Sequence, residues 1–495
     1  MNKLTERYSG LFVLFAGVLA VAAFAPFGWF PMAFLSLAIL FNQWLQDTPR
    51  QAFRNGLLFG LGFFGVGMSW IFVSVHEYGH SHAVAAAPVT LLLVIVLSIY
   101  PALLGYFLAR IFPASSWSVL VVALPAGWVM AEWLRGWTFT GLPWLNMGTA
   151  QIDSPLSGYI PVLGVYGTGW IAALSAALLL AVFRNQRRII SLCCLLALWA
   201  GGALLDRTEW VEPRGEALRV LLVQGNISQE EKWAPENLMN TLSLYSSLTF
   251  AETGSDIIVW PETAIPAFYD QVEGSFIPYL ETELQKTGAT LLTGIPVLDR
   301  SSWEYFNGIL SVGGAQAFYY KQHLVAFGEY LPLRWLIGNA LDALAVPNAD
   351  FTSGADSQPL LQAAGYPVAA SICFEVVFGE QIIRDLPEAA LLVNVSNDAW
   401  FGDSLAPHQH LEMARMRAKE TGRPMLRATN TGISAIIDHN GRIIEQSAQF
   451  EKAVVKGSAV PMQGATPYVM IGNTPVVVAS FMCLLLCGWT GRRLG

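Results

Sequence analysis

Three residues of this chain carry side chains suited to acyl-transfer chemistry. Glu262 and Cys373 each follow a short run that reads as a buried strand, and Lys321 stands among apolar and aromatic residues. In open α/β sheets the reactive groups lie just past the carboxyl ends of the strands. A carboxylate, an ammonium group and a thiol at these places therefore form one candidate site.

The chemistry of these three groups is mutually dependent. A cysteine is a strong nucleophile only after its thiol has lost a proton. A carboxylate is a weak base for a thiol, because the unperturbed pKa values are about 4.3 for Glu and about 8.5 for Cys. Burial of Glu262 and an ammonium group beside Cys373 would bring the two values together. The same Lys321 ammonium could stabilise the oxyanion that forms when the thiolate attacks a carbonyl.

Each residue also has a structural interpretation that spacing alone leaves open. Glu262 could cap the turn that follows it, Lys321 could pair with Glu329, and Cys373 could be packed within a strand. The remaining cysteines lie in apolar runs and read as buried hydrophobic residues, so Cys373 has no partner for an internal disulfide. Those four are Cys193, Cys194, Cys483 and Cys487.

The segment 206–473 alternates between strand and helix patterns. Its apolar runs are short and rich in β-branched residues, which predicts an α/β domain with helices covering the faces of the sheet. We predict strands at 219–224, 256–260, 289–295, 307–313, 366–373, 390–396 and 431–437, and helices at 235–252, 272–286 and 408–421.

The rest of the chain is apolar enough to cross a membrane several times. The sequence is 54% hydrophobic and only 13% charged, whereas soluble proteins carry about 25% charged residues. About eight runs approach the roughly 20 residues that a spanning helix needs. They lie near 10–25, 28–46, 55–74, 85–110, 116–134, 160–183, 189–205 and 474–490.

The domain plan follows from these runs. We predict a transmembrane domain over 1–205, a catalytic domain over 206–473, and a last helix with its tail over 474–495. The first run could be a signal peptide, but Pro26 directly after Ala25 opposes cleavage there, so a retained helix is predicted.

The basic residues predict the orientation. Clusters of Lys and Arg lie before the first run, between the second and third, after the fourth, between the sixth and seventh, and at the C-terminus, whereas the loops 26–28 and 75–84 have none. Cytoplasmic loops carry the excess of Lys and Arg. Both termini are therefore predicted to be cytoplasmic and 206–473 to lie outside. The net charge of -8 leaves no basic surface for a nucleic acid.

At the candidate residues the chain resembles the nitrilase superfamily, whose sites use a Glu-Lys-Cys triad on an αββα sandwich. More narrowly, it is similar to the bacterial apolipoprotein N-acyltransferases, including in the order of seven helices before the domain and one after it. The matching segments are Gln224-Gly225-Asn226 with Trp233, Trp260-Pro261-Glu262, the run 321–330, Ile372-Cys373-Phe374-Glu375, and the runs 394–402 and 410–418.

The resemblance implies a role for each residue. Glu262 would be the general base, Lys321 the oxyanion stabiliser and Cys373 the nucleophile, with Glu329 and Glu375 as supporting carboxylates. Family members often have Tyr where this chain has Phe374, so only an aromatic packing role carries over there. Substrate contacts are expected from Trp233, Tyr330, Trp335 and Trp400.

The resemblance also implies a reaction. Cys373 would take an acyl chain from a membrane phospholipid and pass it to the amine of the diacylglyceryl-cysteine of an apolipoprotein. No metal or other cofactor is expected, because the thioester keeps the energy of the ester. The expected partners are the phospholipid, the diacylated apolipoprotein and the bilayer. A monomer is expected, in the bacterial inner membrane with its catalytic domain in the periplasm.

Alternatives remain at several places. A membrane-tethered nitrilase-type amide hydrolase would use the same residues but would not need so many helices. A transporter would need ionisable residues within its helices, and these runs have almost none besides Glu132 and Arg135. The apolar segment 330–347 could be an arm that dips into lipid or an ordinary core helix. The histidines of 76–82 could bind a metal, but they read better as a solvated loop.

Overall fold

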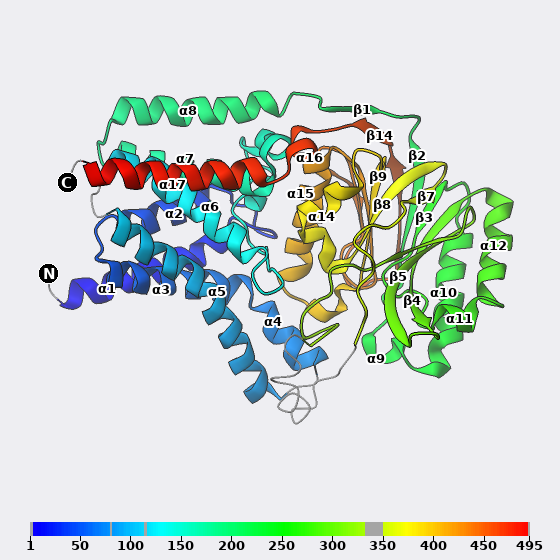
Figure 1. Ribbon diagram of the computed structural model, residues 1–495. Helices are drawn as coiled ribbons and strands as arrows, with labels where there is room; N and C mark the ends of the chain where they lie inside the picture. Colours follow the sequence, from blue (N-terminus) through cyan, green and yellow to red (C-terminus); the bar gives the residue numbers. More distant parts are fainter. Residues whose placement is uncertain (1–2, 80–81, 113–115, 332–349, 494–495) are drawn as a thin grey trace. The chain divides into compact units, whose positions relative to one another are not determined.

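The computed structural model describes residues 3–79, 82–112, 116–331 and 350–493 (Figure 1). The chain divides into two compact units, which are described separately. The helical unit contains Met1–Glu209, Asp403–Glu412 and Thr466–Gly495, and the sheet unit contains Trp210–Gly402 and Met413–Ala465.

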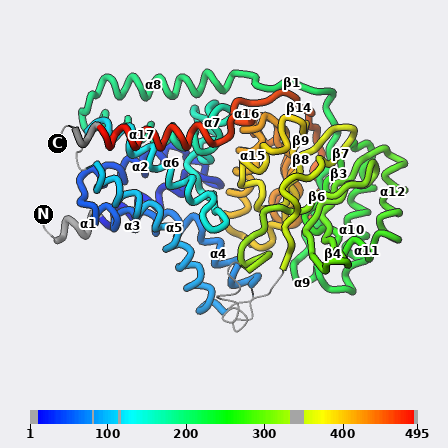
Figure 2. The backbone as a smooth tube through the Cα atoms, viewed as in Figure 1, coloured from blue at the N-terminus to red at the C-terminus, as the bar shows by residue number. Residues whose placement is uncertain are grey.

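The helical unit is built almost entirely from apolar helices. The path of the backbone is followed most easily in Figure 2, where the C-terminal helix returns alongside earlier ones. The helices are α1 (Lys3–Val21), α2 (Pro31–Trp44), α3 (Pro49–Gly67), α4 (Trp70–Val73), α5 (Ala83–Ile111), α6 (Leu124–Arg135), α7 (Ile160–Phe183), α8 (Arg188–Leu205), α16 (Pro467–Ile471) and α17 (Thr474–Arg493).

Glycines allow α1, α3 and α5 to pack closely. A Cβ atom at Gly17 of α1 would lie 2.1 Å from the carbonyl oxygen of Phe59 on α3. On α3, a Cβ at Gly56 would lie 2.4 Å from the carbonyl oxygen of Pro101 on α5. Small residues at such crossings bring backbones together, which is typical of helices that associate within a membrane.

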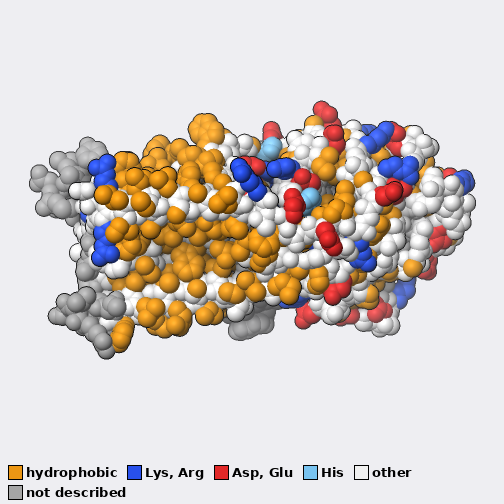
Figure 3. Space-filling view, turned by 90° about the horizontal axis from the view of Figure 1, so that it is seen from above, with side chains coloured by type: hydrophobic (Ala, Val, Ile, Leu, Met, Phe, Trp, Pro, Cys, Tyr) orange, Lys and Arg blue, Asp and Glu red, His pale blue; other side chains and the backbone are white. Residues whose placement is uncertain are grey.

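Many apolar side chains of these helices point outward. On α5, α8 and α17 the exposed residues include Leu92, Ile189, Leu196 and Phe481. On the face drawn in Figure 3, an almost continuous apolar surface covers the helical unit, and charged side chains are sparse there. A surface of this kind needs lipid rather than water to cover it.

The structure supports part of the helix count. Among the described residues, three helices are long and apolar enough to span a membrane: Ala83–Ile111, Ser157–Phe183 and Arg188–Leu205. The bent pair Pro49–Gly67 and Trp70–Tyr78 would make a fourth, and Gly10–Val21 and Thr474–Trp489 are shorter apolar helices. With 14 residues, α2 is shorter than the roughly 20 that a straight span needs. The presence of eight membrane-spanning helices therefore stays a prediction.

The sheet unit is a sandwich of two six-stranded sheets. The first has the order β13-β2-β3-β4-β5-β6, and β2, β3 and β4 are parallel. The second has the order β12-β11-β10-β9-β8-β7, and β8, β9 and β10 are parallel. A further short pair, β1 (Val211–Pro213) with β14 (Met462–Gly464), lies outside both sheets.

The bounds of the strands are as follows. The first sheet contains β2 (Leu218–Gln224), β3 (Ile257–Val259), β4 (Thr290–Asp299), β5 (Glu304–Val312), β6 (Ala317–Tyr320) and β13 (Ala453–Ala459). The second contains β7 (Leu361–Ala363), β8 (Tyr366–Ile372), β9 (Leu391–Ser396), β10 (Met425–Thr429), β11 (Ala435–Ile437) and β12 (Ile443–Gln446).

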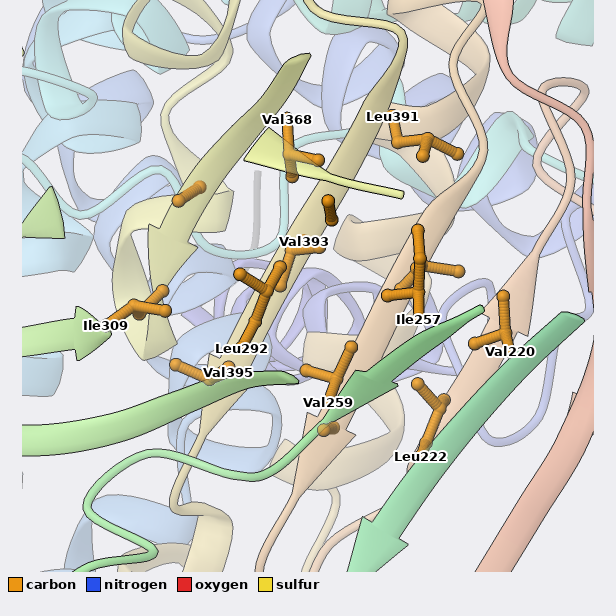
Figure 4. Close-up of a cluster of buried hydrophobic side chains, with 14 of the residues drawn as sticks. Val220, Leu222, Ile257, Val259, Leu292, Ile309, Val368, Leu391, Val393 and Val395 are labelled. Atoms are coloured by element: carbon orange, nitrogen blue, oxygen red, sulfur yellow. The ribbon is translucent and has the colours of Figure 1, made fainter. Parts of the chain in front are cut away.

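The main core of this unit lies between the sheets. Leu222 and Val259 of the first sheet and Val393 and Val395 of the second belong to one buried cluster, drawn in Figure 4. A second cluster joins the other face of the first sheet to its helices. These helices are α10 (Leu238–Phe250), α11 (Tyr269–Val272) and α12 (Phe276–Thr287), and α9 (Gln229–Lys232) precedes them.

Helices also stand beside the second sheet. Figure 1 shows α14 (Gly379–Ile382) and the part of α15 (Ala406–Thr421) that belongs to the sheet unit, from Met413 onward, next to β8 and β9. The layers are therefore helix, sheet, sheet and helix, as expected for an αββα sandwich. The parallel strands of both sheets run toward an edge where the next residues of the chain form the candidate site.

Candidate active site

Glu262 is held in a tight turn just beyond β3. The preceding Trp260 is wholly buried, and its indole N–H donates to the Thr249 hydroxyl at 2.8 Å. On the neighbouring β4, a Cβ at Gly294 would lie 2.6 Å from the Glu262 Cα. Only a glycine leaves room for the turn. The packing of β4 therefore fixes the position of the Glu262 backbone, from which the carboxylate side chain extends.

The carboxylate of Glu262 is nearly buried and fully oriented. Its Oε1 accepts a hydrogen bond from the Asn307 side-chain amide at 2.7 Å, and its Oε2 accepts one from the backbone N–H of Asn397 at 2.8 Å. Lys321 Nζ lies 3.9 Å from Oε1. Donors on both oxygens leave the carboxylate little freedom to rotate.

Lys321 follows β6, and its ammonium group faces two carboxylates. Nζ lies 2.7 Å from Glu329 Oε1 and 3.9 Å from Glu262 Oε1, and the side chain is 1% exposed. Burial acts to lower the pKa of Lys321, but Glu329, Glu262 and Cys373 outweigh it and raise the pKa above its ordinary value. The lysine therefore stays charged in the site.

Cys373 begins a short 3₁₀ helix, Cys373–Val377, at the end of β8. Its φ of 52° places a residue with a Cβ in the left-handed region. Such a conformation costs energy and is concentrated at functional sites. The residue as a whole is half-buried.

The thiol of Cys373 is protonated at neutral pH. Burial, followed by the negative charge of Glu262, raises its pKa to about 12, although Lys321 lowers it. The thiolate is therefore not preformed, and a base must take the proton as the sulfur attacks.

The high pKa of Cys373 predicts how its rate of reaction with iodoacetamide depends on pH. Well below the pKa, the thiolate fraction rises about tenfold for each pH unit. We expect the labelling rate of Cys373, followed by peptide mass spectrometry, to keep that slope from pH 7 to pH 9. A plateau by pH 8 would contradict the expectation. Glu262→Gln removes a negative charge near the sulfur and should label faster at every pH.

Glu375 is a buried carboxylate that joins two segments of the site. It accepts hydrogen bonds from the backbone N–H of Gln322 at 2.7 Å and of Ile372 at 2.7 Å. Further bonds come from the His323 N–H at 3.0 Å and the Tyr319 hydroxyl at 3.0 Å. Burial raises its pKa, and the positive charge of Lys321 counters this. Glu375 thus links Gln322, which follows Lys321, to Ile372, which precedes Cys373.

Glu329 forms the pair with Lys321 that the sequence left as a structural alternative. Its other oxygen accepts a hydrogen bond from the Val325 N–H at 2.8 Å. Asn307 Nδ2 lies 2.7 Å from Glu262 and 3.4 Å from Glu329, so one amide bridges both carboxylates. The structural pair and the candidate triad are parts of the same cluster.

The chain matches two family models and many curated proteins. The description "Apolipoprotein N-acyltransferase N-terminal domain" matches residues 16–178, and "Carbon-nitrogen hydrolase" matches residues 219–463. A protein of Methylococcus capsulatus, named apolipoprotein N-acyltransferase, is 48% identical over 94% of this chain and 93% of its own. A Nitrosomonas europaea protein of the same name is 44% identical over 98% of this chain and 99% of its own.

This chain belongs to the apolipoprotein N-acyltransferase family. The carbon-nitrogen hydrolase match spans every candidate site residue described above. Among solved structures, a Saccharomyces cerevisiae member of branch 10 of the nitrilase superfamily aligns with a TM-score of 0.39 and 16% identity. It covers 51% of this chain and 93% of its own.

The expected substrate contacts of this apolipoprotein N-acyltransferase family member are only partly in view. Trp233 and Trp400 are 52% and 46% exposed, which leaves indole surface for an apolar ligand. Tyr330 is half-buried. Trp335 and most of the proposed arm lie outside the described residues. The substrate roles of all four therefore remain predictions.

Phe374 packs among other aromatic rings. Its centroid lies 5.2 Å from that of Phe378, edge to face, and 6.0 Å from that of His323. Such geometry stabilises aromatic clusters without any hydroxyl group. The side chain thus has the aromatic surroundings that the resemblance implied for it.

The sequence reasoning missed three residues around Glu262. Asn307 and Asn397 hold its two oxygens, and Lys232 donates to its backbone carbonyl at 3.1 Å. Burial lowers the pKa of Lys232 to about 8, and the charge of Glu262 partly offsets this. Lys232 follows four polar residues, Ser228 to Glu231, so the local pattern indicated a solvated face. Only its place next to Trp233, within a matched motif, could have marked it.

Proposed function

We propose that this protein transfers a fatty acyl chain from a membrane phospholipid to the N-terminal amine of a diacylated apolipoprotein. One observation carries the proposal: the half-buried Cys373 shares a site with Glu262 and Lys321 in a chain whose family is named for this reaction. Each of the three residues has a defined role in the two steps that follow.

In the first step, Cys373 attacks the ester carbonyl of the phospholipid. Glu262 takes the thiol proton, a C–S bond forms, and Lys321 faces the oxygen that becomes negative. The ester C–O bond then breaks, and Glu262 returns the proton to the departing lysophospholipid oxygen. Because the thiol pKa is about 12, proton removal and attack must proceed together.

In the second step, the amine of the diacylglyceryl-cysteine attacks the thioester carbonyl. A C–N bond forms, the C–S bond breaks, and its electron pair goes to sulfur. Glu262 removes a proton from the amine and passes it to the thiolate, which restores the enzyme. The thioester conserves the energy of the ester, so the exchange requires no cofactor to drive it.

We place the protein in the bacterial inner membrane with both termini cytoplasmic. The proposed plan has eight spanning helices, with a periplasmic catalytic domain over 206–473 flanked by 1–205 and 474–495. Figure 2 supports it, since the described start of α1 and the end of α17 point to the same end of the helical unit. In Figure 1 the turn from α7 to α8, which holds Arg184 and Arg187, lies at that end too. We propose that the active form is a monomer.

An acyl-labelling experiment tests the function. The full-length protein is incubated with phospholipid that carries a labelled acyl chain, and the label on Cys373 is located by peptide mapping. We expect an adduct that hydroxylamine removes, because hydroxylamine cleaves thioesters. Cys373→Ala should abolish it, and Cys194→Ala, which alters a cysteine of α8, should not.

A second addition identifies the acceptor. A diacylated lipopeptide with a free amine should discharge the label onto that amine, whereas an N-acetylated lipopeptide should not. No adduct in the wild type, or an adduct that persists in Cys373→Ala, would overturn the proposal. Discharge to water alone would identify a hydrolase instead.

A further inference from the structure

A buried serine lies beside the sulfur of Cys373. Strands β8 and β9 are parallel, with Ile372 opposite Val395, so the next residues, Cys373 and Ser396, are neighbours at the ends of their strands. Ser396 is wholly buried. Its hydroxyl stands within reach of the Cys373 sulfur, and a hydrogen bond from it to the thiolate lowers the pKa of the thiol.

The same hydroxyl is also held from its other side. Ser396 Oγ donates to Asp398 Oδ1 at 2.7 Å. Asp398 Oδ2 pairs with Arg427 on β10 at 2.8 Å, and neither side chain is exposed. Gly432 makes room for this carboxylate, because a Cβ there would lie 2.4 Å from Asp398 Oδ2. A continuous chain of contacts thus runs from Arg427 to the sulfur.

A serine hydroxyl has a single proton to donate. While Cys373 is a thiol or a thioester, that proton can go to the Asp398 carboxylate. Once the sulfur carries a negative charge, the hydroxyl stabilises it only by turning its proton toward the sulfur. Arg427 makes this turn easier, because it balances the charge of Asp398 and so weakens the hold of that carboxylate on the proton.

We propose that Ser396 is a further catalytic residue that hydrogen-bonds the Cys373 sulfur whenever the sulfur is negative, and that Asp398, whose charge Arg427 balances, holds the hydroxyl while the sulfur is neutral. This inference rests on the proposed function. The hydrogen bond from Ser396 matters most in the second step, when the C–S bond breaks and the electron pair moves to sulfur. A thiolate that is better stabilised leaves faster.

Other charged groups also face the sulfur. Glu262 beyond β3 and Asp398 beyond β9 raise the pKa of Cys373, and Lys321 beyond β6 lowers it. Removing the serine hydroxyl and removing the buried ion pair should therefore move the thiol pKa in opposite directions. A general loosening of the fold would move it in the same direction in both variants.

The test measures iodoacetamide labelling of Cys373 against pH in the full-length protein. Loss of one hydrogen bond to a charged atom should raise the thiol pKa by about one unit, so Ser396→Ala should label about tenfold more slowly. The double variant Asp398→Asn with Arg427→Met keeps no unpaired buried charge, and it should label faster than the wild type. Ser434→Ala, at a buried serine bonded to Gln224, is the matched control and should label at the wild-type rate.

A single-turnover measurement completes the test. In Ser396→Ala the preformed acyl adduct should discharge to the lipopeptide about tenfold more slowly. The rate of this step should fall more than the rate of adduct formation. An unchanged labelling profile, or shifts of the same sign in Ser396→Ala and the double variant, would overturn the inference. If the wild type forms no acyl adduct, the proposed function fails, and the labelling profiles still decide the role of Ser396.

Discussion

Glu262→Gln is expected to form the acyl adduct on Cys373 about 10³-fold more slowly than the wild type, within the 10²- to 10⁴-fold range of general-base catalysis. Glutamine keeps the shape of the side chain but cannot accept the thiol proton. It also has one oxygen where Asn307 and the Asn397 N–H each require an acceptor, so the side chain loses part of its orientation.

The experiment compares two rates in the same variant. Adduct formation is followed with labelled phospholipid, and labelling by iodoacetamide reports the thiol itself. Because the negative charge of Glu262 raises the thiol pKa, Glu262→Gln should label faster while it acylates more slowly. A purely structural role would slow or speed both rates together. Acylation within tenfold of the wild-type rate would rule out Glu262 as the base.

A partly exposed glutamate away from the site provides the control for this substitution. Glu283 pairs with Lys286 at 2.6 Å on the surface of α12. Exposed pairs of this kind contribute about 0–1 kcal/mol. Glu283→Gln should therefore leave both the acylation rate and the labelling rate at wild-type values.

Glu375→Ala is expected to destabilise the protein by about 3–5 kcal/mol, the cost of breaking a buried polar network. The substitution leaves the N–H groups of Gln322, His323 and Ile372 without their acceptor. Each buried donor that is left unsatisfied costs about 1–3 kcal/mol, and neighbouring losses are not additive. Thermal unfolding followed by tryptophan fluorescence measures the change.

The matched control lies five residues further along the chain. Glu380 is exposed at the start of α14, and surface substitutions usually change stability by less than about 0.5 kcal/mol. Glu380→Ala should therefore unfold at the wild-type temperature. If Glu375→Ala did so as well, the hydrogen bonds to its carboxylate would not hold the site together.

Much of the sheet unit could be predicted because its central strands are continuous apolar runs. The expected strands 366–373 and 390–396 correspond closely to β8 and β9. The expected strand 431–437 contains only β11, and β10 at Met425–Thr429 was missed. Arg427 interrupts that run, and its burial depends on Asp398, which is distant in sequence. A local pattern cannot reveal a charge that is balanced by another strand.

The site was predictable in outline and not in detail. Apolar strands ending at Glu262 and Cys373 placed these residues at one edge. The amide bridge of Asn307 joins β5 to residues beyond β3 and β6, and the left-handed backbone of Cys373 leaves no mark in its residue type, so neither could be predicted from a local pattern. The apolar helices were recognised by composition, yet which of them pack together depends on tertiary contacts, such as the glycine contacts between α1 and α3.

The high pKa of the Cys373 thiol has a consequence for the lifetime of the enzyme. Oxidants attack a thiolate far more readily than a thiol, and the sulfinic and sulfonic acids that follow are not reduced back by ordinary thiols. In the proposed periplasmic placement, the cysteine would work in an oxidising environment without the reducing systems of the cytoplasm. By staying protonated until a lipid ester arrives, Cys373 presents little thiolate to oxidants between turnovers. The same burial that makes the nucleophile slow to ionise keeps it chemically durable.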